Sequence, residues 1–237
     1  MDGDGPPVLL LHAGISDGRL WDALVPLLAG FRLIRPDLRG FGETVAAPGG
    51  YSPIGDLLAV LDRLEVERVA VCGVSFGAAL ALALASEHPT RVSHVAALCP
   101  LGVASGPSAE LIGRIRAIDR RGESGDHAGA AEAEVELWLG PAGERERTRA
   151  LAMATRAWQV GGGRHEAEVA EPLALAAIGA HALIGYGELD QDDCRRDATA
   201  IAELVPRAEL VALAGCGHLP PLERPELVAA LLRGLVS

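Results

Sequence analysis

Apolar residues in this chain fall into short unbroken runs, separated by longer stretches with helical character. The runs are rich in Val, Leu and Ile without polar alternation, which is typical of strands buried on both faces of a parallel sheet. Strands are expected at residues 7–12, 31–36, 68–73, 92–98, 181–185 and 208–213. Helices are expected at residues 19–29, 53–64, 76–88, 173–178, 193–204 and 225–235. This alternation predicts an α/β fold with a mostly parallel sheet and helices on both faces.

The alternation stops between residues 100 and 172. Three helical stretches follow one another there with no strand between them, at residues 108–121, 126–139 and 144–158. We therefore expect residues 1–99 and 173–237 to form one core, and residues 100–172 to form a helical insertion.

One serine lies at the junction of an expected strand and an expected helix, in Gly73-Val74-Ser75-Phe76-Gly77. A serine on such a sharp turn needs small residues two positions away on each side, which Gly73 and Gly77 supply. The helix after it directs free backbone N–H groups toward any anion that forms there. The setting favours a nucleophile, although a chain with 29 glycines can also contain this string by chance.

Other polar residues follow other strands of the expected sheet. Ligands of open parallel sheets bind beyond the carboxyl ends of the strands. The loops at that edge contain His12-Ala13-Gly14, Ser75, Gly187-Glu188-Leu189-Asp190 and Gly217-His218. A serine, an acid and a histidine are thus expected at one edge, in the order Ser, Asp, His.

Composition removes several classes of function. The net charge of -11 argues against a nucleic-acid partner, because phosphate binding requires a positive face. The absence of Lys excludes Schiff-base chemistry, and the absence of Asn excludes a Cys-His-Asn triad. No apolar run approaches the roughly 20 residues of a membrane span and no signal peptide is evident, so we expect a soluble, cytoplasmic protein with no membrane partner. The four cysteines, Cys72, Cys99, Cys194 and Cys216, are expected to be reduced and mostly buried.

Five motifs in this order resemble the α/β-hydrolase superfamily, in particular its serine-nucleophile branch with small esterases and enol-lactonases. They are the loop at residues 12–14, Asp37-Leu38-Arg39-Gly40-Phe41-Gly42, the elbow at residues 73–77, the loop at residues 187–190 and Gly215-Cys216-Gly217-His218. The insertion falls where this family places its helical cap. Relatives usually begin with two more strands, so either the sheet is shortened or the recorded start is internal. In the shortened sheet, the strand at residues 31–35 would be an edge available for a homodimer.

The resemblance implies a role for each matching position. Ser75 would be the nucleophile, His218 the general base and acid, and Asp190 the carboxylate that orients the imidazole. Glu188, Asp192 and Asp193 remain alternatives for that carboxylate. The oxyanion hole would consist of the backbone N–H groups of Phe76 and Gly14. No cofactor or metal is expected.

Residues outside these motifs have weaker interpretations. The substrate pocket is expected to include Ile15, Trp138, Met153, Trp158 and Leu219, although apolar residues on such helices pack against each other more often than they meet substrate. His12 is expected to be structural, and Asp37 and Arg39 to stabilise a turn. The Arg-rich stretch 144–156 is expected to be a solvated helix face, or else to offer a guanidinium to a substrate carboxylate.

The resemblance implies a serine hydrolase that cleaves an ester or lactone bond through an acyl-enzyme. Aromatic residues make up only 3% of the chain, which favours a small, mainly apolar substrate over stacked sugars or bases. The alternatives are a cofactor-free perhydrolase, a carbon–carbon bond hydrolase, and a non-hydrolytic protein of the same fold, such as a cyclase, a dehydratase or a ligand-binding protein.

Overall fold

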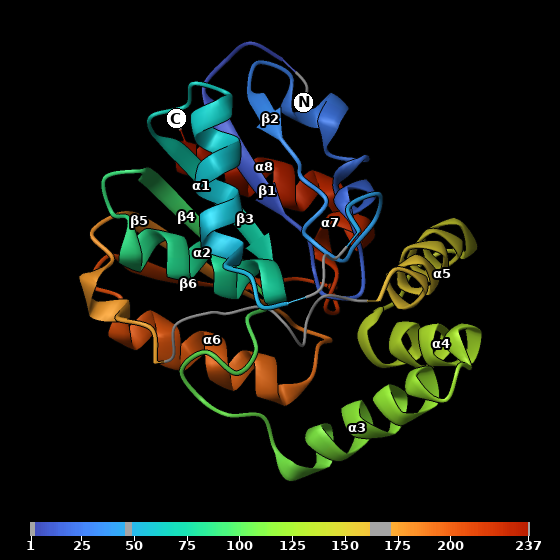
Figure 1. The fold of residues 1–237 in the computed structure, drawn as a ribbon. Helices are drawn as coiled ribbons and strands as arrows, with labels where there is room; N and C mark the ends of the chain where they lie inside the picture. The colour runs from blue at the N-terminus through green and yellow to red at the C-terminus, as the bar shows by residue number, and fades with distance from the viewer. Residues whose placement is uncertain (1–2, 46–48, 162–171, 237) are drawn as a thin grey trace.

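The computed structural model describes residues 3–45, 49–161 and 172–236. Its centre is a six-stranded sheet in the order β2-β1-β3-β4-β5-β6, and all five strand pairs are parallel (Figure 1). The strands are β1 (Pro7–Leu11), β2 (Arg32–Ile34), β3 (Val69–Val74), β4 (Val92–Leu98), β5 (His181–Gly187) and β6 (Ala208–Leu213). The predicted fold class, a parallel sheet between helices, is confirmed, and β2 is an edge strand as expected.

Helices cover both faces of the sheet because successive strand residues point to opposite faces. Leu9 and Leu11 of β1 pack into the cluster that includes α1 (Pro53–Arg63), α2 (Phe76–Glu87) and part of α6 (Asp192–Leu204). Val8 and Leu10 face the opposite cluster, which includes α8 (Pro225–Val236). In Figure 1, α1 and α8 lie on opposite sides of the sheet. A further helix, α7 (Pro220–Glu223), is too short to have been predicted.

Three helices follow β4 without a strand between them, as the sequence pattern indicated. They are α3 (Ala109–Glu123), α4 (His127–Trp138) and α5 (Glu144–Gln159). α4 packs against both α3 and α5, and the three helices lie together to one side of the sheet (Figure 1). The end of the expected insertion, residues 162–171, lies outside the described residues.

Polar side chains define where several of these helices begin. Ser52 accepts a hydrogen bond from the backbone N–H of Gly55, and Asp126 accepts one from that of Gly129. Each satisfies an N–H group that a helix leaves without an internal partner, an interaction typically worth about 1 kcal/mol.

Two predicted helices are shorter in the structure. The stretch at residues 19–29 forms two 3-10 helices, η1 (Gly18–Trp21) and η2 (Val25–Leu28). Pro26 has no backbone N–H, so it cannot donate the hydrogen bond that one continuous helix would need there. The stretch at residues 173–178 contains only the 3-10 helix η4 (Leu175–Ala177), a single tight turn of the kind that often connects longer elements.

Strand order determines where a ligand can bind. β1 pairs with β2 on one side and with β3 on the other. The chain therefore adds β2 on one side of β1, and then adds β3 and the later strands on the opposite side. Such a switch leaves a crevice at the carboxyl ends of the strands. The loops after β1 and β3 border this crevice. None of the described helices is long and apolar enough to cross a membrane.

Candidate active site

Ser75 lies between β3 and α2 in a backbone conformation that L-residues rarely adopt, with φ of 54° and ψ of -115°. A Cβ atom at Gly73 would lie 2.0 Å from the carbonyl oxygen of Gly77, and one at Gly77 would lie 2.2 Å from that of Leu11. Only glycine fits at either position. Strain of this kind costs about 1–3 kcal/mol and persists at functional sites. The two glycines therefore allow a turn that exposes the Ser75 side chain at the sheet edge.

The backbone beside Ser75 can receive negative charge. Phe76 is the first residue of α2, so its N–H has no partner within the helix, and the helix dipole adds partial positive charge there. Gly14 lies in the loop after β1 and lines the same cavity as Ser75 and Phe76. Among the described residues, neither N–H has a hydrogen-bond acceptor. Both groups are therefore available to an oxyanion.

Asp190 and His218 form a buried hydrogen-bonded pair. Nδ1 of His218 lies 2.7 Å from Oδ2 of Asp190, and both side chains are 2% exposed. Because a carboxylate accepts, Nδ1 carries the proton and Nε2 is left as the acceptor on the opposite side of the ring. An imidazole held in this way can accept a proton at Nε2.

Short contacts between two loops bring Asp190 and His218 together. The N–H of Leu189 donates to the carbonyl oxygen of Cys216 at 2.8 Å. A Cβ atom at Gly187 would lie 2.1 Å from the carbonyl oxygen of Gly217. This close approach places the loop after β5 directly against the loop after β6.

The other acids considered for this position point elsewhere. Glu188 accepts from the N–H of Gly215, and Asp192 pairs with Arg195. Asp193 accepts hydrogen bonds from Ser108 and therefore holds the segment before α3. Asp190 is the one of the four that contacts His218.

A cavity of about 130 Å³ lies where the core meets the helical insertion. Ser75 and His218 both line it, although no hydrogen bond joins their side chains in the structure. Catalytic hydrogen bonds are often long before substrate binds. Of the expected pocket residues, Ile15 and Trp138 line the cavity.

The remaining expected pocket residues, Met153, Trp158 and Leu219, are not among its lining residues. Met153 and Leu219 are fully buried in the hydrophobic core, and the Trp158 ring packs on Gly122, where a Cβ atom would lie 2.3 Å from it. These side chains fill space between elements, which is the alternative that the sequence left open.

Sequence reasoning missed four lining residues on α3 and α4. They are Ile115, Ile118, Asp119 and Glu134. The signal that could have found Glu134 is its i, i+4 spacing to Trp138, which places both on one face of α4. The spacing of Ile115, Ile118 and Asp119 follows the same rule on α3.

The loop that contains His218 is fixed from both sides. The Glu223 carboxylate accepts hydrogen bonds from three backbone N–H groups. They belong to Leu219, at 3.0 Å, to Gly140, at 3.2 Å, and to Gly217. Burial raises the pKa of Glu223, and these backbone hydrogen bonds oppose that effect. Glu223 therefore ties the residues on either side of His218 to the end of α4.

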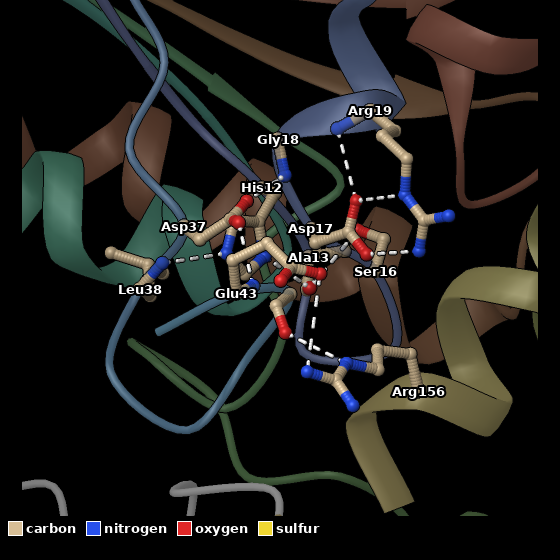
Figure 2. Close-up of polar contacts among 11 residues, drawn as sticks. His12, Ala13, Ser16, Asp17, Gly18, Arg19, Asp37, Leu38, Glu43 and Arg156 are labelled. Carbon is tan, nitrogen blue, oxygen red and sulfur yellow. Dashed lines mark hydrogen bonds and ion pairs between the residues drawn. The ribbon is translucent and has the colours of Figure 1, made fainter. Parts of the chain in front are cut away.

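His12 supports the loop after β1. Its Nδ1 lies 2.9 Å from the carbonyl oxygen of Ala13, and its Nε2 accepts from the N–H of Leu38 at 3.0 Å (Figure 2). Burial lowers the pKa of His12, which keeps the ring neutral and suits one donor and one acceptor nitrogen. Both nitrogens are occupied, so the expected structural role is confirmed.

The turn at residues 37–42 is stabilised by its own charged residues, as expected. Asp37 accepts from the N–H groups of Gly18 and Glu43, each at 2.8 Å (Figure 2). Arg39 makes two hydrogen bonds to Asp56, at 2.7 and 2.9 Å.

Arg156 of α5 joins the insertion to this turn. Its Nε donates to the carbonyl oxygen of Gly42 at 2.9 Å (Figure 2). Among the described residues, no arginine lines the cavity beside Ser75. The idea that the Arg-rich helix offers a guanidinium to substrate therefore finds no support in the position of Arg156.

All four cysteines are free and buried, as predicted. Cys99, Asp190 and His218 are the described side chains that are close enough to share a metal ion, with ligand atoms within 4.8 Å of one another. Burial raises the pKa of Cys99 far above its usual value, and its Sγ donates to the carbonyl oxygen of Gly217 at 3.6 Å. In the structure, Asp190 and His218 are hydrogen-bonded to each other.

Comparisons with known proteins agree with the fold. A 2-hydroxymuconate semialdehyde hydrolase from Pseudomonas sp. (strain CF600) is 29% identical, over 97% of this chain and 86% of that protein. A thermophilic esterase from Thermogutta terrifontis, solved with malate bound, is 26% identical with a TM-score of 0.79, over 98% of this chain and 90% of that one. The enol-lactonase from Burkholderia xenovorans LB400 has the same fold, with 24% identity and a TM-score of 0.81, over 99% of this chain and 94% of that one. The sequence model of the alpha/beta hydrolase family matches residues 8–231, and the chain belongs to that family.

Proposed function

We propose that this protein is a serine hydrolase that cleaves an ester or lactone bond of a small, mainly apolar substrate through an acyl-enzyme. The observation that carries the proposal is the hydrogen bond of 2.7 Å between Asp190 and His218, at the wall of the cavity that Ser75 also lines. A base held in one tautomer and a half-buried serine that line the same cavity supply the groups that acyl transfer requires.

In the first half-reaction, Ser75 Oγ attacks the carbonyl carbon while its proton passes to Nε2 of His218. The carbonyl oxygen becomes an oxyanion, and the N–H groups of Phe76 and Gly14 stabilise it. The bond to the leaving oxygen then breaks, and the proton on Nε2 passes to that oxygen. Asp190 stabilises the imidazolium that exists between the two proton transfers. Loss of one oxyanion donor costs about 3–4 kcal/mol in other hydrolases.

In the second half-reaction, water attacks the acyl carbon and gives its proton to His218. The same two N–H groups stabilise the second oxyanion, and Ser75 leaves with the proton from Nε2. In a lactone the leaving alcohol remains part of the product, which is then a hydroxy acid. Neither half-reaction requires an added cofactor.

A second candidate is the hydrolysis of a carbon–carbon bond. It is favoured by the 29% identity to a 2-hydroxymuconate semialdehyde hydrolase across nearly the whole chain. The same three side chains would serve both reactions. Turnover of 2-hydroxymuconate semialdehyde faster than of short esters would favour this candidate over the first.

Hydrolysis of short p-nitrophenyl esters tests the proposal. We expect Ser75→Ala to lower kcat by about 10⁵-fold or more, and Asp190→Asn to lower it by about 10⁴-fold. Asp192→Asn is the matched control, because Asp192 lies two residues from Asp190 and pairs with Arg195 at the surface. It should leave kcat within about twofold of the wild-type value. A folded Ser75→Ala protein with wild-type activity would overturn the proposal.

A further inference from the structure

The buried carboxylate of Asp190 receives more than one hydrogen bond. Its Oδ2 accepts from Nδ1 of His218 at 2.7 Å, and its Oδ1 accepts from the backbone N–H of Gln191, also at 2.7 Å. The side chain is only 2% exposed, so water has little access to the remaining lone pairs. A buried carboxylate without enough donors is costly, and each further donor restricts its rotation. The orientation of His218 therefore depends on what else surrounds Asp190.

A thiol on the first turn of α6 lies against this pair. Cys194 follows Asp190 by four residues and is 0% exposed. Its Sγ lies 3.5 Å from Nδ1 of His218. Nδ1 already carries the proton that it donates to Asp190, so it cannot accept the thiol proton. The Asp190 carboxylate is the acceptor that remains within reach of the S–H group.

Cys194 stays protonated in this setting. Burial raises the pKa of its thiol, and both the negative charge of Asp190 and a hydrogen bond with the Asp190 side chain raise it further. The thiol is therefore a donor at neutral pH and adds no second anion beside the carboxylate. Because it is an uncharged and weak donor, it can satisfy the carboxylate without competing with the imidazolium that forms on His218.

A second buried thiol, Cys99 at the end of β4, lies near the same pair. Its Sγ is within 4.8 Å of the ligand atoms of Asp190 and His218, and it donates to the carbonyl oxygen of Gly217 at 3.6 Å. This thiol is directed at the backbone beside His218 and not at the carboxylate. Of the two thiols, Cys194 is thus the one that can hold Asp190.

We propose that Cys194 is a positioning residue for catalysis, whose S–H group donates to the Asp190 carboxylate and restrains the rotation of the group that orients His218. It neither touches substrate nor takes part in proton transfer. The proposal rests on the proposed use of His218 as general base and adds the residue that holds its partner. Because Gln191 also holds the carboxylate, loss of the thiol should loosen Asp190 without releasing it.

Steady-state hydrolysis of p-nitrophenyl butanoate is the first measurement. Cys194→Ala removes the donor, and we expect kcat to fall by about three- to tenfold with KM within about twofold of wild type. Cys194→Ser supplies a hydroxyl donor in place of the thiol, and kcat should stay within about twofold of wild type. Cys72→Ala is the matched control, because Cys72 in β3 is also 0% exposed and its thiol makes no hydrogen bond within the described part of the chain. It should leave kcat within about twofold of wild type.

The proton on Nδ1 of His218 reports directly on the hydrogen bond to Asp190. In the ¹H NMR spectrum of wild-type protein we expect its signal downfield of the backbone amide protons, and loss of the signal in His218→Gln identifies it. Cys194→Ala should shift this signal, Cys194→Ser should return it toward the wild-type position, and Cys72→Ala should leave it in place. A loss of packing alone would lower Tm without moving the signal.

This signal does not depend on ester hydrolysis, so it separates the inference from the proposed function. A shift in Cys194→Ala protein that Cys194→Ser reverses, without any hydrolysis by wild-type protein, would support the positioning role and contradict the proposed chemistry. A signal that Cys194→Ala leaves in place would overturn the positioning role. So would equal effects of Cys194→Ala and Cys194→Ser, because the change would then come from packing and not from the lost donor.

Discussion

The backbone N–H of His218 donates to the carbonyl oxygen of Trp138 at 3.1 Å, and the two rings lie with centroids 4.3 Å apart. Trp138 is the last residue of α4, so the insertion contacts the imidazole directly. A movement of α4 would therefore change both the lining of the cavity and the position of His218. We infer that the insertion contributes to the geometry of catalysis as well as to the enclosure of substrate.

Replacement of Trp138 tests this coupling. Trp138→Phe keeps a ring over His218, and we expect kcat/KM for p-nitrophenyl butanoate to fall by less than about threefold. Trp138→Ala removes the ring and should lower kcat/KM by about tenfold or more, together with about 3 kcal/mol of stability. Steady-state kinetics at a temperature well below the Tm of each variant measure the first effect. Equal activity of the two variants would contradict the coupling.

Glu223 is expected to position His218 without touching substrate. Glu223→Ala leaves the backbone N–H groups of Gly140, Gly217 and Leu219 without their acceptor, and we expect kcat to fall by about 10- to 100-fold with little change in KM. The rate of Ser75 modification by a fluorophosphonate should fall in parallel, because a displaced His218 accepts the Ser75 proton less well. A loss of stability alone would leave this rate unchanged in protein that is still folded. Glu226→Gln, an exposed acid on α8, is the control and should show neither effect. A rise in KM alone would exclude a role in positioning His218.

Gly73 is expected to tolerate no side chain. Gly73→Ala would place Cβ 2.0 Å from a backbone oxygen, so the turn must shift. We expect a loss of about 3 kcal/mol or more, which is a fall in Tm of about 6–12 °C in a chain of this size. Gly113→Ala, in the exposed part of α3 with no atom near its Cβ position, should instead raise Tm slightly. Thermal unfolding followed by circular dichroism compares the two, and similar Tm values would contradict the expected clash.

Acid should destabilise the protein partly through His12. Burial lowers the pKa of His12, so between that lowered value and about 6.5 the unfolded chain binds one more proton than the folded chain. The stability from neutral His12 is present above pH 6.5 and is lost as the pH falls, by up to about 1.4 kcal/mol per pH unit. Urea unfolding between pH 7 and 5 should show a shallower decline in His12→Gln than in wild type. Parallel curves would exclude this contribution.

The sequence predicted the elements whose signal is local. The strands and the turn at Ser75 depend on short apolar runs and on glycines two positions from the serine, and both features can be read directly. The prediction of one helix at residues 19–29 was wrong, because the periodic pattern of apolar residues was given more weight than a single proline. Pro26 divides the stretch into two 3-10 helices.

Contacts between distant segments could not be predicted in the same way. Nothing near Glu223 in the sequence indicates that its carboxylate accepts from both sides of His218 and from the end of α4. Three glutamates, Glu132, Glu134 and Glu136, lie on α4, and the spacing to Trp138 places Glu134 on the same helix face as that residue. That this face meets the cavity depends on how α4 packs. These roles depend on tertiary structure.

Covalent labelling of Ser75 tests the central claim most directly. We expect intact-mass spectrometry to show one fluorophosphonate adduct on wild-type protein, peptide mapping to place it on Ser75, and Ser75→Ala protein to remain unlabelled. His218→Ala should be labelled far more slowly, because the proton on Ser75 then has no acceptor. Folded wild-type protein that acquires no adduct, or an adduct that maps to another residue, would contradict the account.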